Sequence, residues 1–298
     1  MRVDDIAAAG LRLLPIKRRT LVQIRNRRDL KGAFFGIKKA VTFNEKIEWI
    51  KANYRKPLMV RCADKYLARE YVGSLLPETY LVPLYGVYRR AEEINYDQLP
   101  EQFALKVNHG SGWNIFCRSK SQLDRRQANA QLNGWLDQSW YNHRNREWVY
   151  KDIPRRIVCE KYFIPGEGGW PLNYKVHCFH GVARYVELGS NNQSEVYSRN
   201  IYDRDWNLQP FRWNYPNLHF AVERPSHLEE LLRISERLAA PFPYVRADFF
   251  IEDGQIYFNE LTFYPSNALS RFYPEKYDAL VGGHLDLDRV RCELSRGL

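Results

Sequence analysis

The sequence holds few cysteines and no long apolar run. Its five cysteines, at positions 62, 117, 159, 178 and 292, show no Cys-x-x-Cys spacing, which suggests neither a disulfide framework nor a zinc site and fits a reducing cytosol. The N-terminal segment MRVDDIAAAGLRLLPIKRR carries acids where a signal peptide needs cations, and nothing later reaches membrane-spanning length. We therefore expect a soluble, cytoplasmic protein that is not exported by that route.

Two common nucleotide-binding signatures are missing as well. The chain has neither the GxxxxGKS/T spacing of a P-loop nor a GxGxxG motif after a strand, so both of these site types are disfavoured. It also has no internal repeat and no low-complexity tract. What is present is typical of a globular protein: 298 residues, 45% of them hydrophobic and 14% aromatic, enough for one large or two modest domains.

Basic residues are concentrated near the start of the chain. The net charge is +10, and residues 1–60 hold fifteen Lys and Arg against five Asp and Glu, so the remainder is balanced. Apolar residues interleave with these cations over 11–28, as in a basic amphipathic helix. Such a segment attracts an anionic membrane surface or an acidic glycan, whereas nucleic acid is disfavoured because no binding motif accompanies the charge. A solvated helix face packed on its own domain is the simpler alternative.

Capping and turn signals predict an α+β protein. Helices are expected over 10–31, over 43–54 with Thr42 as cap and Glu45 completing a capping box, over 62–75, from a cap at Ser121 toward Tyr141, and over 226–240. Strands are expected over 80–88, 103–107, 115–117 and 157–164, with a hairpin of 173–179 and 183–188. Antiparallel strand pairs mixed with helices indicate α+β rather than a regular parallel sheet.

The segment VRADFFIEDGQIYFNELTFYP, residues 245–265, predicts a hairpin with two carboxylates. Two β-rich runs flank an Asp-Gly turn, and a three-residue loop would place Asp248 opposite Glu260 and Arg246 opposite Thr262 on one polar face. Acids among aromatic residues need partners, and two adjacent carboxylates suit Mg²⁺, whose other ligands are water and phosphate oxygens.

A second register of the same hairpin remains open. A two-residue loop would pair Phe249 with Phe258 and Ile251 with Ile256, and it would send the two acids to opposite faces. Apolar pairing favours this register, whereas metal chemistry favours the other. An exposed hairpin with solvated acids is a further alternative.

Two other segments are candidates for a nucleotide site. In FALKVNHGSGWNIF, residues 103–116, Lys106 lies near the end of a strand and small residues follow it, so that backbone N–H groups can approach an anion. In residues 158–163, an apolar strand ends in Glu-Lys and then aromatics, which can offer main-chain groups to a purine edge. Taken alone, the first is an ordinary tight turn and the second a strand leaving the core.

The order of these elements resembles the ATP-grasp superfamily. The carboxylate hairpin is similar to the metal-binding end of D-alanine–D-alanine ligases. FNEKIEWIKANYRKPL, CADKYLAREYV, FALKVNHGSGWNI and VRADFFIEDGQIYFNELTFYPSNA together look like the TupA-like ATP-grasp proteins, over roughly residues 40–285. The resemblance implies an ATP-grasp fold in which two α+β subdomains, 61–165 and 166–298, sandwich ATP behind a basic helical segment at 1–60.

The resemblance also implies roles for individual residues. ATP would be bound by Lys65, Lys106, His109, Ser111, Gly112, Glu160, Lys161, Tyr162, Phe163 and Lys175. Within that set Lys65, Lys106 and Lys175 face phosphates, residues 109–114 form a lid and residues 160–163 form the adenine hinge. One or two Mg²⁺ ions would be held by Asp248, Glu260 and Thr262, and catalysis would depend on Arg246 and Lys106. Thr262 stands where the superfamily often has a metal-binding Asn, and Asn173 where an acid often holds the ribose.

The implied activity is an ATP- and Mg²⁺-dependent carboxylate–amine ligase that acts through an acyl-phosphate. The TupA-like family is tied to bacterial surface polysaccharides, so the expected acceptor is an acidic glycan, a lipid-linked sugar or an acidic residue, and the expected donor is an amino acid or amine. The basic segment would hold that acceptor or the inner face of the membrane. A kinase with an ATP-grasp site and a non-catalytic nucleotide-binding protein remain alternatives.

Overall fold

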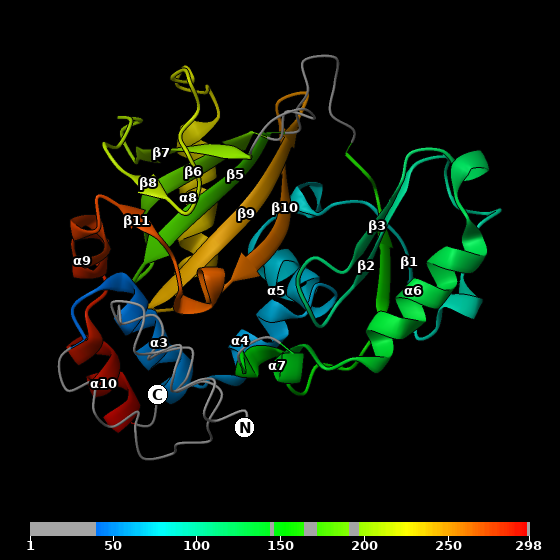
Figure 1. Ribbon diagram of the computed structural model, residues 1–298, viewed down its shortest axis with the longest axis horizontal. Coiled ribbons are helices and arrows are strands. Elements are labelled where there is room, and N and C mark those ends of the chain that lie inside the picture. Colours follow the sequence, from blue (N-terminus) through cyan, green and yellow to red (C-terminus); the bar gives the residue numbers. More distant parts are fainter. Residues whose placement is uncertain (1–39, 144–145, 164–171, 191–196, 297–298) are drawn as a thin grey trace, which may run out of the picture.

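The computed structural model describes residues 40–143, 146–163, 172–190 and 197–296. The helix expected over 10–31 lies outside the described residues. Figure 1 shows two sheets on either side of a central region, with helices α4 (Pro57–Ala63) and α5 (Leu67–Leu75) between them. The observed mixture of helices and antiparallel sheets confirms the α+β expectation.

The larger sheet has five antiparallel strands. Its order is β10-β9-β5-β6-β7, and the bounds are Leu172–Phe179 for β5, Val182–Ser190 for β6, Ser198–Asp203 for β7, Tyr244–Glu252 for β9 and Gln255–Thr262 for β10. Sequence alternation gives this sheet an apolar face and a polar face.

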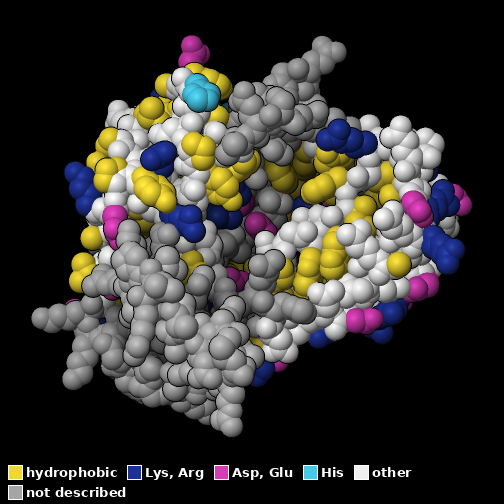
Figure 2. Space-filling view, viewed as in Figure 1, with side chains coloured by type: hydrophobic (Ala, Val, Ile, Leu, Met, Phe, Trp, Pro, Cys, Tyr) yellow, Lys and Arg dark blue, Asp and Glu magenta, His cyan; other side chains and the backbone are white. Residues whose placement is uncertain are grey.

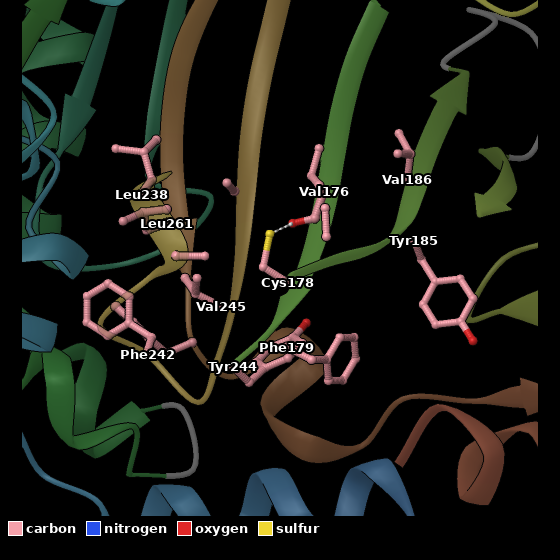
Figure 3. Packing of buried hydrophobic residues seen from close by; sticks show 14 of the residues in the cluster. Val176, Cys178, Phe179, Tyr185, Val186, Leu238, Phe242, Tyr244, Val245 and Leu261 are labelled. Carbon is pink, nitrogen blue, oxygen red and sulfur yellow. Dashed lines mark hydrogen bonds between the residues drawn. The ribbon is translucent and has the colours of Figure 1, made fainter. Parts of the chain in front are cut away.

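Helix α8 (Leu228–Ala239) covers the apolar face. Its buried residues recur every three to four positions, as expected of an amphipathic helix. Figure 3 shows Leu238 of α8 in one buried cluster with Val176, Val245 and Leu261 from three strands of the sheet. Because this face is sealed by apolar packing, the charged residues of the same strands lie on the opposite face.

The smaller sheet has its own core. It consists of β1 (Leu84–Tyr88), β4 (Ile157–Glu160), β2 (Phe103–Val107) and β3 (Asn114–Cys117) in that order, all antiparallel. Helix α6 (Arg125–Asp137) packs on one side through Leu132 and Leu136. The other side looks toward the larger sheet.

Short elements complete the larger half of the molecule. They are α3 (Phe43–Asn53), α7 (Trp140–His143), the two-stranded ribbon of β8 (Arg212–Trp213) and β11 (Phe272–Tyr273), α9 (Lys276–Gly283) and α10 (Leu287–Ser295). Phe43 of α3 contacts Trp213 and Tyr244 at centroid distances of 5.1 Å each, which ties α3 and the ribbon to the sheet.

Several sequence predictions hold at the level of single elements. The capping box is present: the Thr42 hydroxyl accepts from the Glu45 backbone N–H, and the Glu45 carboxylate accepts from the Thr42 backbone N–H. The strands over 103–107, 115–117 and 173–188 and the helix over 226–240 are also found, within two residues at each end.

Other boundary predictions were wrong. The helix expected over 62–75 is interrupted at Asp64, whose carboxylate accepts from the backbone N–H of Tyr66 and so competes with helix continuation. The helix expected to begin at Ser121 begins after Asp124, which accepts from the Gln127 N–H at 2.9 Å and is the true cap. That helix ends at residue 137. The strand expected over 80–88 begins only after Pro83.

Candidate functional site

The β9–β10 hairpin uses both registers that the sequence allows. Next to the turn, Phe249 is opposite Phe258, as the apolar alternative predicts. Farther along, Glu260 is opposite Asp248, as the metal alternative predicts. The change occurs at Asn259, an extra residue that forms a β-bulge in β10. The bulge lets the apolar rings stay in register while both carboxylates share the polar face.

Asp248 is fully buried and surrounded by cations. Its Oδ1 accepts from Arg246 Nε at 2.6 Å, and its Oδ2 accepts from Arg246 Nη2 at 2.7 Å and from Lys175 Nζ at 2.6 Å. Arg246 Nη2 also donates to Thr262 Oγ1 at 3.1 Å. By contrast, the nearest ion-pair contact of Glu260 among the described residues is 3.9 Å, to Arg246 Nη2. Glu260 is therefore the more available carboxylate.

The charges of this cluster are fixed by their surroundings. Burial alone would raise the pKa of Asp248, but the charges of Arg246 and Lys175 outweigh it and hold the pKa below its ordinary value. Burial would lower the pKa of Arg246, but Asp248 outweighs that and raises it. Asp248 and Arg246 therefore remain ionised at neutral pH.

Lys106 approaches the cluster from the smaller sheet. Alternate residues of β2 pack under α6, so Lys106 faces the other way. It forms an ion pair with Glu160 of β4 and donates to Asn259 Oδ1 at 3.2 Å. This hydrogen bond joins the two sheets. Figure 2 shows a hollow between the two halves in which acidic side chains are visible.

Lys65 lies in the break between α4 and α5. Asp64 shapes the break and accepts from Asn108 Nδ2 at 2.8 Å, which anchors it to the strand end of β2. Lys65 donates to the carbonyl of Gly110 in the loop between β2 and β3. Burial lowers the pKa of Lys65, partly offset by the nearby charge of Glu260. The interrupted helix thus brings a third lysine toward the two carboxylates.

The predicted phosphate loop is a tight connection between β2 and β3. A Cβ on Gly110 would lie 2.8 Å from the Trp113 ring, so that position requires glycine, and Gly112 has a φ of 77°. Ser111 and Gly112 are exposed. His109 is buried, with Nε2 2.9 Å from a backbone oxygen, and burial lowers its pKa.

The predicted adenine hinge crosses between the sheets directly after β4. The ammonium of Lys161 forms an ion pair with Glu252 at the end of β9. The Phe163 ring lies 5.2 Å from that of Phe250, and Tyr162 stacks on an exposed ring of β3. Hinge and larger sheet are therefore in direct contact through apolar and charged groups.

A row of polar residues continues across the larger sheet beyond Lys175. Glu187 of β6 is opposite Lys175 and forms an ion pair with Arg199 of β7, and both are buried or nearly so. His177 lies beside this pair, with Nε2 3.9 Å from the Glu187 carboxylate. Burial would raise the pKa of Glu187, but the Arg199 charge outweighs it and the pKa is lowered. The polar face is thus a continuous strip of alternating charges.

The donor set of the cluster fits a hard cation that shares its ligands with phosphate. Within the described ranges, no three His, Cys, Asp or Glu side chains form a ready-made metal cage. Asp248 and Glu260 face one another and supply oxygen ligands only, which suits Mg²⁺ bound partly by substrate oxygens. The Thr262 hydroxyl, by contrast, already accepts from Arg246.

The chain matches the TupA-like ATPgrasp family over residues 45–286, which is most of its length. The protein belongs to the TupA-like ATP-grasp family. It is therefore a member of the ATP-grasp superfamily, and the predicted ATP-grasp fold is confirmed. No curated protein matches the chain in sequence.

Solved structures similar to this TupA-like protein are distant. D-Alanine–D-alanine ligase from Bacillus anthracis complexed with ATP has 14% identity, with 72% of this chain and 55% of that chain covered and a TM-score of 0.40. A second structure of that ligase has 19% identity, coverages of 82% and 71%, and a TM-score of 0.46. The ATP-grasp ligase PsnB complexed with minimal precursor, Mg and ADP has 12% identity, coverages of 88% and 67%, and a TM-score of 0.37. The chain thus spans little more than half of the first ligase.

Sequence reasoning missed several residues that the structure adds to the site. The position of Asn259 was not predicted because the two registers of the hairpin were treated as exclusive, whereas a bulge at Asn259 allows both. Glu187 and Arg199 join through sheet pairing that the sequence does not reveal. Asn173, by contrast, was predicted from the sequence to lie near the ribose. Its Oδ1 is buried and accepts no hydrogen bond from any described residue.

Proposed function

We propose that this protein is an ATP- and Mg²⁺-dependent carboxylate–amine ligase. The observation that carries the proposal is that Lys175 and Arg246 converge on Asp248, which faces Glu260, while Lys106 of the other sheet bonds to Asn259 beside Glu260. Lysine and arginine groups fixed in a cleft balance the charge of a triphosphate and stabilise charge that develops during phosphoryl transfer.

The proposed metal site follows from the same contacts. Glu260 would hold Mg²⁺ together with Asp248, whose oxygens are now occupied by Arg246 and Lys175. A bound Mg²⁺ would neutralise phosphate charge and orient the γ-phosphoryl group. Lys175, released from Asp248, would then be free to contact a phosphate oxygen.

The proposed reaction has two steps. An oxygen of the acceptor carboxylate attacks the γ-phosphorus, the bond to the β-phosphate oxygen breaks, and ADP leaves. The amine nitrogen then attacks the acyl carbon and loses a proton, and the carbon–oxygen bond to phosphate breaks. Arg246, which remains charged, would stabilise the anionic oxygen of the tetrahedral state. Lys106 and Lys65 would hold the phosphates, and residues 160–163 the adenine.

We assign the acceptor to the acidic glycans, lipid-linked sugars or acidic residues of bacterial surface polysaccharides and the donor to amino acids or amines. The family match supports the superfamily chemistry, and the basic residues 1–39 support an anionic acceptor. We place the enzyme in the cytoplasm, with peripheral attachment to the membrane. No described helix is long and apolar enough to cross a bilayer.

The test is a product analysis by mass. Purified protein is incubated with MgATP, uronic acids and a set of amino acids, and released phosphate and product masses are measured. A ligase gives an amide whose mass equals acceptor plus amine minus water, and phosphate release depends on both. A phosphorylated acceptor formed without amine would establish a kinase, and nucleotide binding without turnover would establish a non-catalytic protein. Glu260→Gln is the inactive control.

A further inference from the structure

The β8–β11 ribbon has two chemically different faces. Trp213 and Phe272 are opposite each other and buried, and Trp213 stacks on His177 of the polar strip at 4.2 Å. Their neighbours Arg212 and Tyr273 are also opposite each other but exposed, with the guanidinium 5.1 Å from the tyrosine ring centroid. The inner face is part of the core, and the outer face is free for a ligand.

An open cavity lies on the outer face. Its volume is about 460 Å³, within the range of small-ligand sites. We name it the ribbon cavity, and its lining residues are Pro210, Phe211, Arg212, Asn217, Tyr273 and Pro274.

Two polar groups of the ribbon cavity lack an ionic or hydrogen-bond partner among the described residues. Arg212 forms no ion pair with any other described residue, and the Tyr273 side chain, 45% exposed, is one of the most exposed large apolar groups. Asn217 Oδ1 is buried yet accepts no hydrogen bond from a described residue. A buried acceptor without a donor is costly, so this oxygen indicates a ligand or water that supplies an O–H or N–H.

The loop that lines the ribbon cavity is tied to the larger sheet at two points. The loop after β8 is fixed to β7, where the Arg199 N–H donates to the Pro216 carbonyl at 2.8 Å, and the Arg199 guanidinium lies 4.1 Å from the Tyr215 ring centroid. Arg199 in turn pairs with Glu187 on the polar strip. At the other end of the loop, Asn214 Nδ2 donates to Ser266 Oγ at 2.9 Å, four residues beyond Thr262. The loop that carries Asn217 is therefore anchored both to the polar strip and to the turn after β10.

We propose that the ribbon cavity binds an acidic sugar unit of the acceptor, one or more units away from the reacting carboxylate. Arg212 would pair with the sugar carboxylate, the tyrosine ring would pack on the apolar face of the sugar, and Asn217 Oδ1 would accept from a hydroxyl. The assignment of this ligand as part of the acceptor rests on the proposed ligase function. The proposal that the ribbon cavity binds an acidic sugar does not depend on that function.

A peptide ligand fits less well. Both ribbon strands are two residues long, so they offer no strand edge for peptide pairing. A fully deprotonated anion such as sulfate also fits less well because it cannot donate to Asn217 Oδ1. An acidic sugar supplies the anion, the hydroxyl donor and the apolar ring face together.

The test compares three soluble probes by calorimetry. Trigalacturonic acid carries both sugar rings and charge, maltotriose carries rings only, and tri-L-glutamate carries charge only. We expect the full-length protein to bind trigalacturonic acid most tightly. Arg212→Gln should weaken that binding about tenfold, the loss expected for one charge-assisted hydrogen bond, and Tyr273→Ala should weaken both sugars. Residues 1–39 are present in every variant, so differences report the cavity.

Two matched control variants distinguish binding in the ribbon cavity from a general effect of exposed charges or rings. Arg118→Gln removes an exposed arginine of the other half, and Phe220→Ala removes a side chain that is 63% exposed outside the cavity. Both should bind trigalacturonic acid like the parent. Unchanged binding by Arg212→Gln and Tyr273→Ala, at parental melting temperatures, would overturn the proposal, as would equal binding of tri-L-glutamate. If sugar binding follows the expectation but no acceptor is ligated, the cavity assignment stands and the ligase function fails.

Discussion

At the residue scale, the two carboxylates of the hairpin have different surroundings although they face one another. Asp248 is enclosed by Arg246 and Lys175, so its charge is already compensated. Glu260 is partly exposed and has only a distant cation. The same chemical group therefore has two different surroundings: Asp248 holds two cations in place, and Glu260 is available to the Mg²⁺ that we propose.

This asymmetry predicts different results for two isosteric substitutions. Glu260→Gln should abolish Mg²⁺-dependent turnover with little change in melting temperature, because no close ion pair is lost. Asp248→Asn should abolish turnover and also lower the unfolding free energy by about 3 kcal/mol, because two buried cations lose their counter-ion. Phosphate release and thermal denaturation measure both effects. Substantial activity in both variants would contradict the metal assignment.

The lowered pKa of Lys65 predicts that nucleotide binding is coupled to proton uptake. Burial holds its folded pKa below the ordinary 10.5, so between the two values the unfolded chain binds more protons and the unfolding free energy rises with pH. A phosphate beside Lys65 would raise the pKa again. At a pH between the folded pKa of Lys65 and 10.5 we therefore expect MgATP binding to take up protons, seen as a buffer-dependent heat in calorimetry. Lys65→Met should remove the uptake. Its persistence in that variant would show that another group titrates.

At the element scale, local signals predicted most elements, and tertiary contacts decided the rest. Alternation in residues 103–107 correctly put Lys106 on the face away from the core, because strand parity is a local property. The helix over 62–75 failed because Asp64 also bonds to Asn108, a partner 44 positions away. The hairpin was predicted as one of two registers, whereas the bulge at Asn259 satisfies both. Sequence alone therefore identified the carboxylates but not the residue that aligns them.

The turn after β10 is held in an unfavourable backbone conformation. Ser266, Asn267 and Ala268 have φ values of 50°, 51° and 60°, each costing on the order of 1 kcal/mol for a residue with a Cβ. Two side chains from other segments fix this turn: Lys51 Nζ donates to Asn267 Oδ1 at 3.1 Å, and Asn214 Nδ2 donates to Ser266 Oγ at 2.9 Å. Since the turn begins four residues after Thr262, Lys51 of α3 helps to position the chain just beyond the β9–β10 hairpin.

The hydrogen bond from Lys51 to Asn267 predicts that effects on stability and effects on activity can be separated by mutation. Lys51 also pairs with buried Glu48 at 2.7 Å, so Glu48→Gln alone should destabilise by about 3 kcal/mol. The double variant Lys51→Met with Glu48→Leu removes both charges, and its unfolding free energy should lie within about 2 kcal/mol of that of the parent. It still loses the donor to Asn267, and we expect kcat to fall with KM for ATP little changed. A double variant with full kcat would show that Lys51 only stabilises.

At the scale of the whole molecule, function depends on two halves with separate cores. The larger core lies under α8 and extends over one end of the other face of the five-stranded sheet, where Phe43 packs on Trp213 and Tyr244, and the smaller core lies under α6. Polar groups form links between them: Lys106 with Asn259 and Lys161 with Glu252. Apolar contact joins the halves at the hinge, where the Phe163 ring lies 5.2 Å from that of Phe250, whereas water can replace the polar links when the halves separate. The proposed nucleotide site therefore lies between two halves that are joined at the hinge and by two polar links.

The distribution of charge makes a last prediction about the whole molecule. Residues 1–60 carry the entire excess of positive charge, so we expect the full chain to bind vesicles containing anionic lipid in a salt-dependent way, each exposed cation near the surface contributing about 1 kcal/mol. The variant for this test reverses six of these cations to Glu, namely Lys17, Arg18, Arg19, Arg25, Arg27 and Arg28. It should lose vesicle binding in co-sedimentation but keep MgATP affinity, because every residue assigned to the nucleotide lies beyond position 60. Neutral vesicles are the control for both proteins. If charge reversal abolishes nucleotide binding or folding instead, the basic residues stabilise the enzyme itself, and attachment to the membrane is excluded as their role.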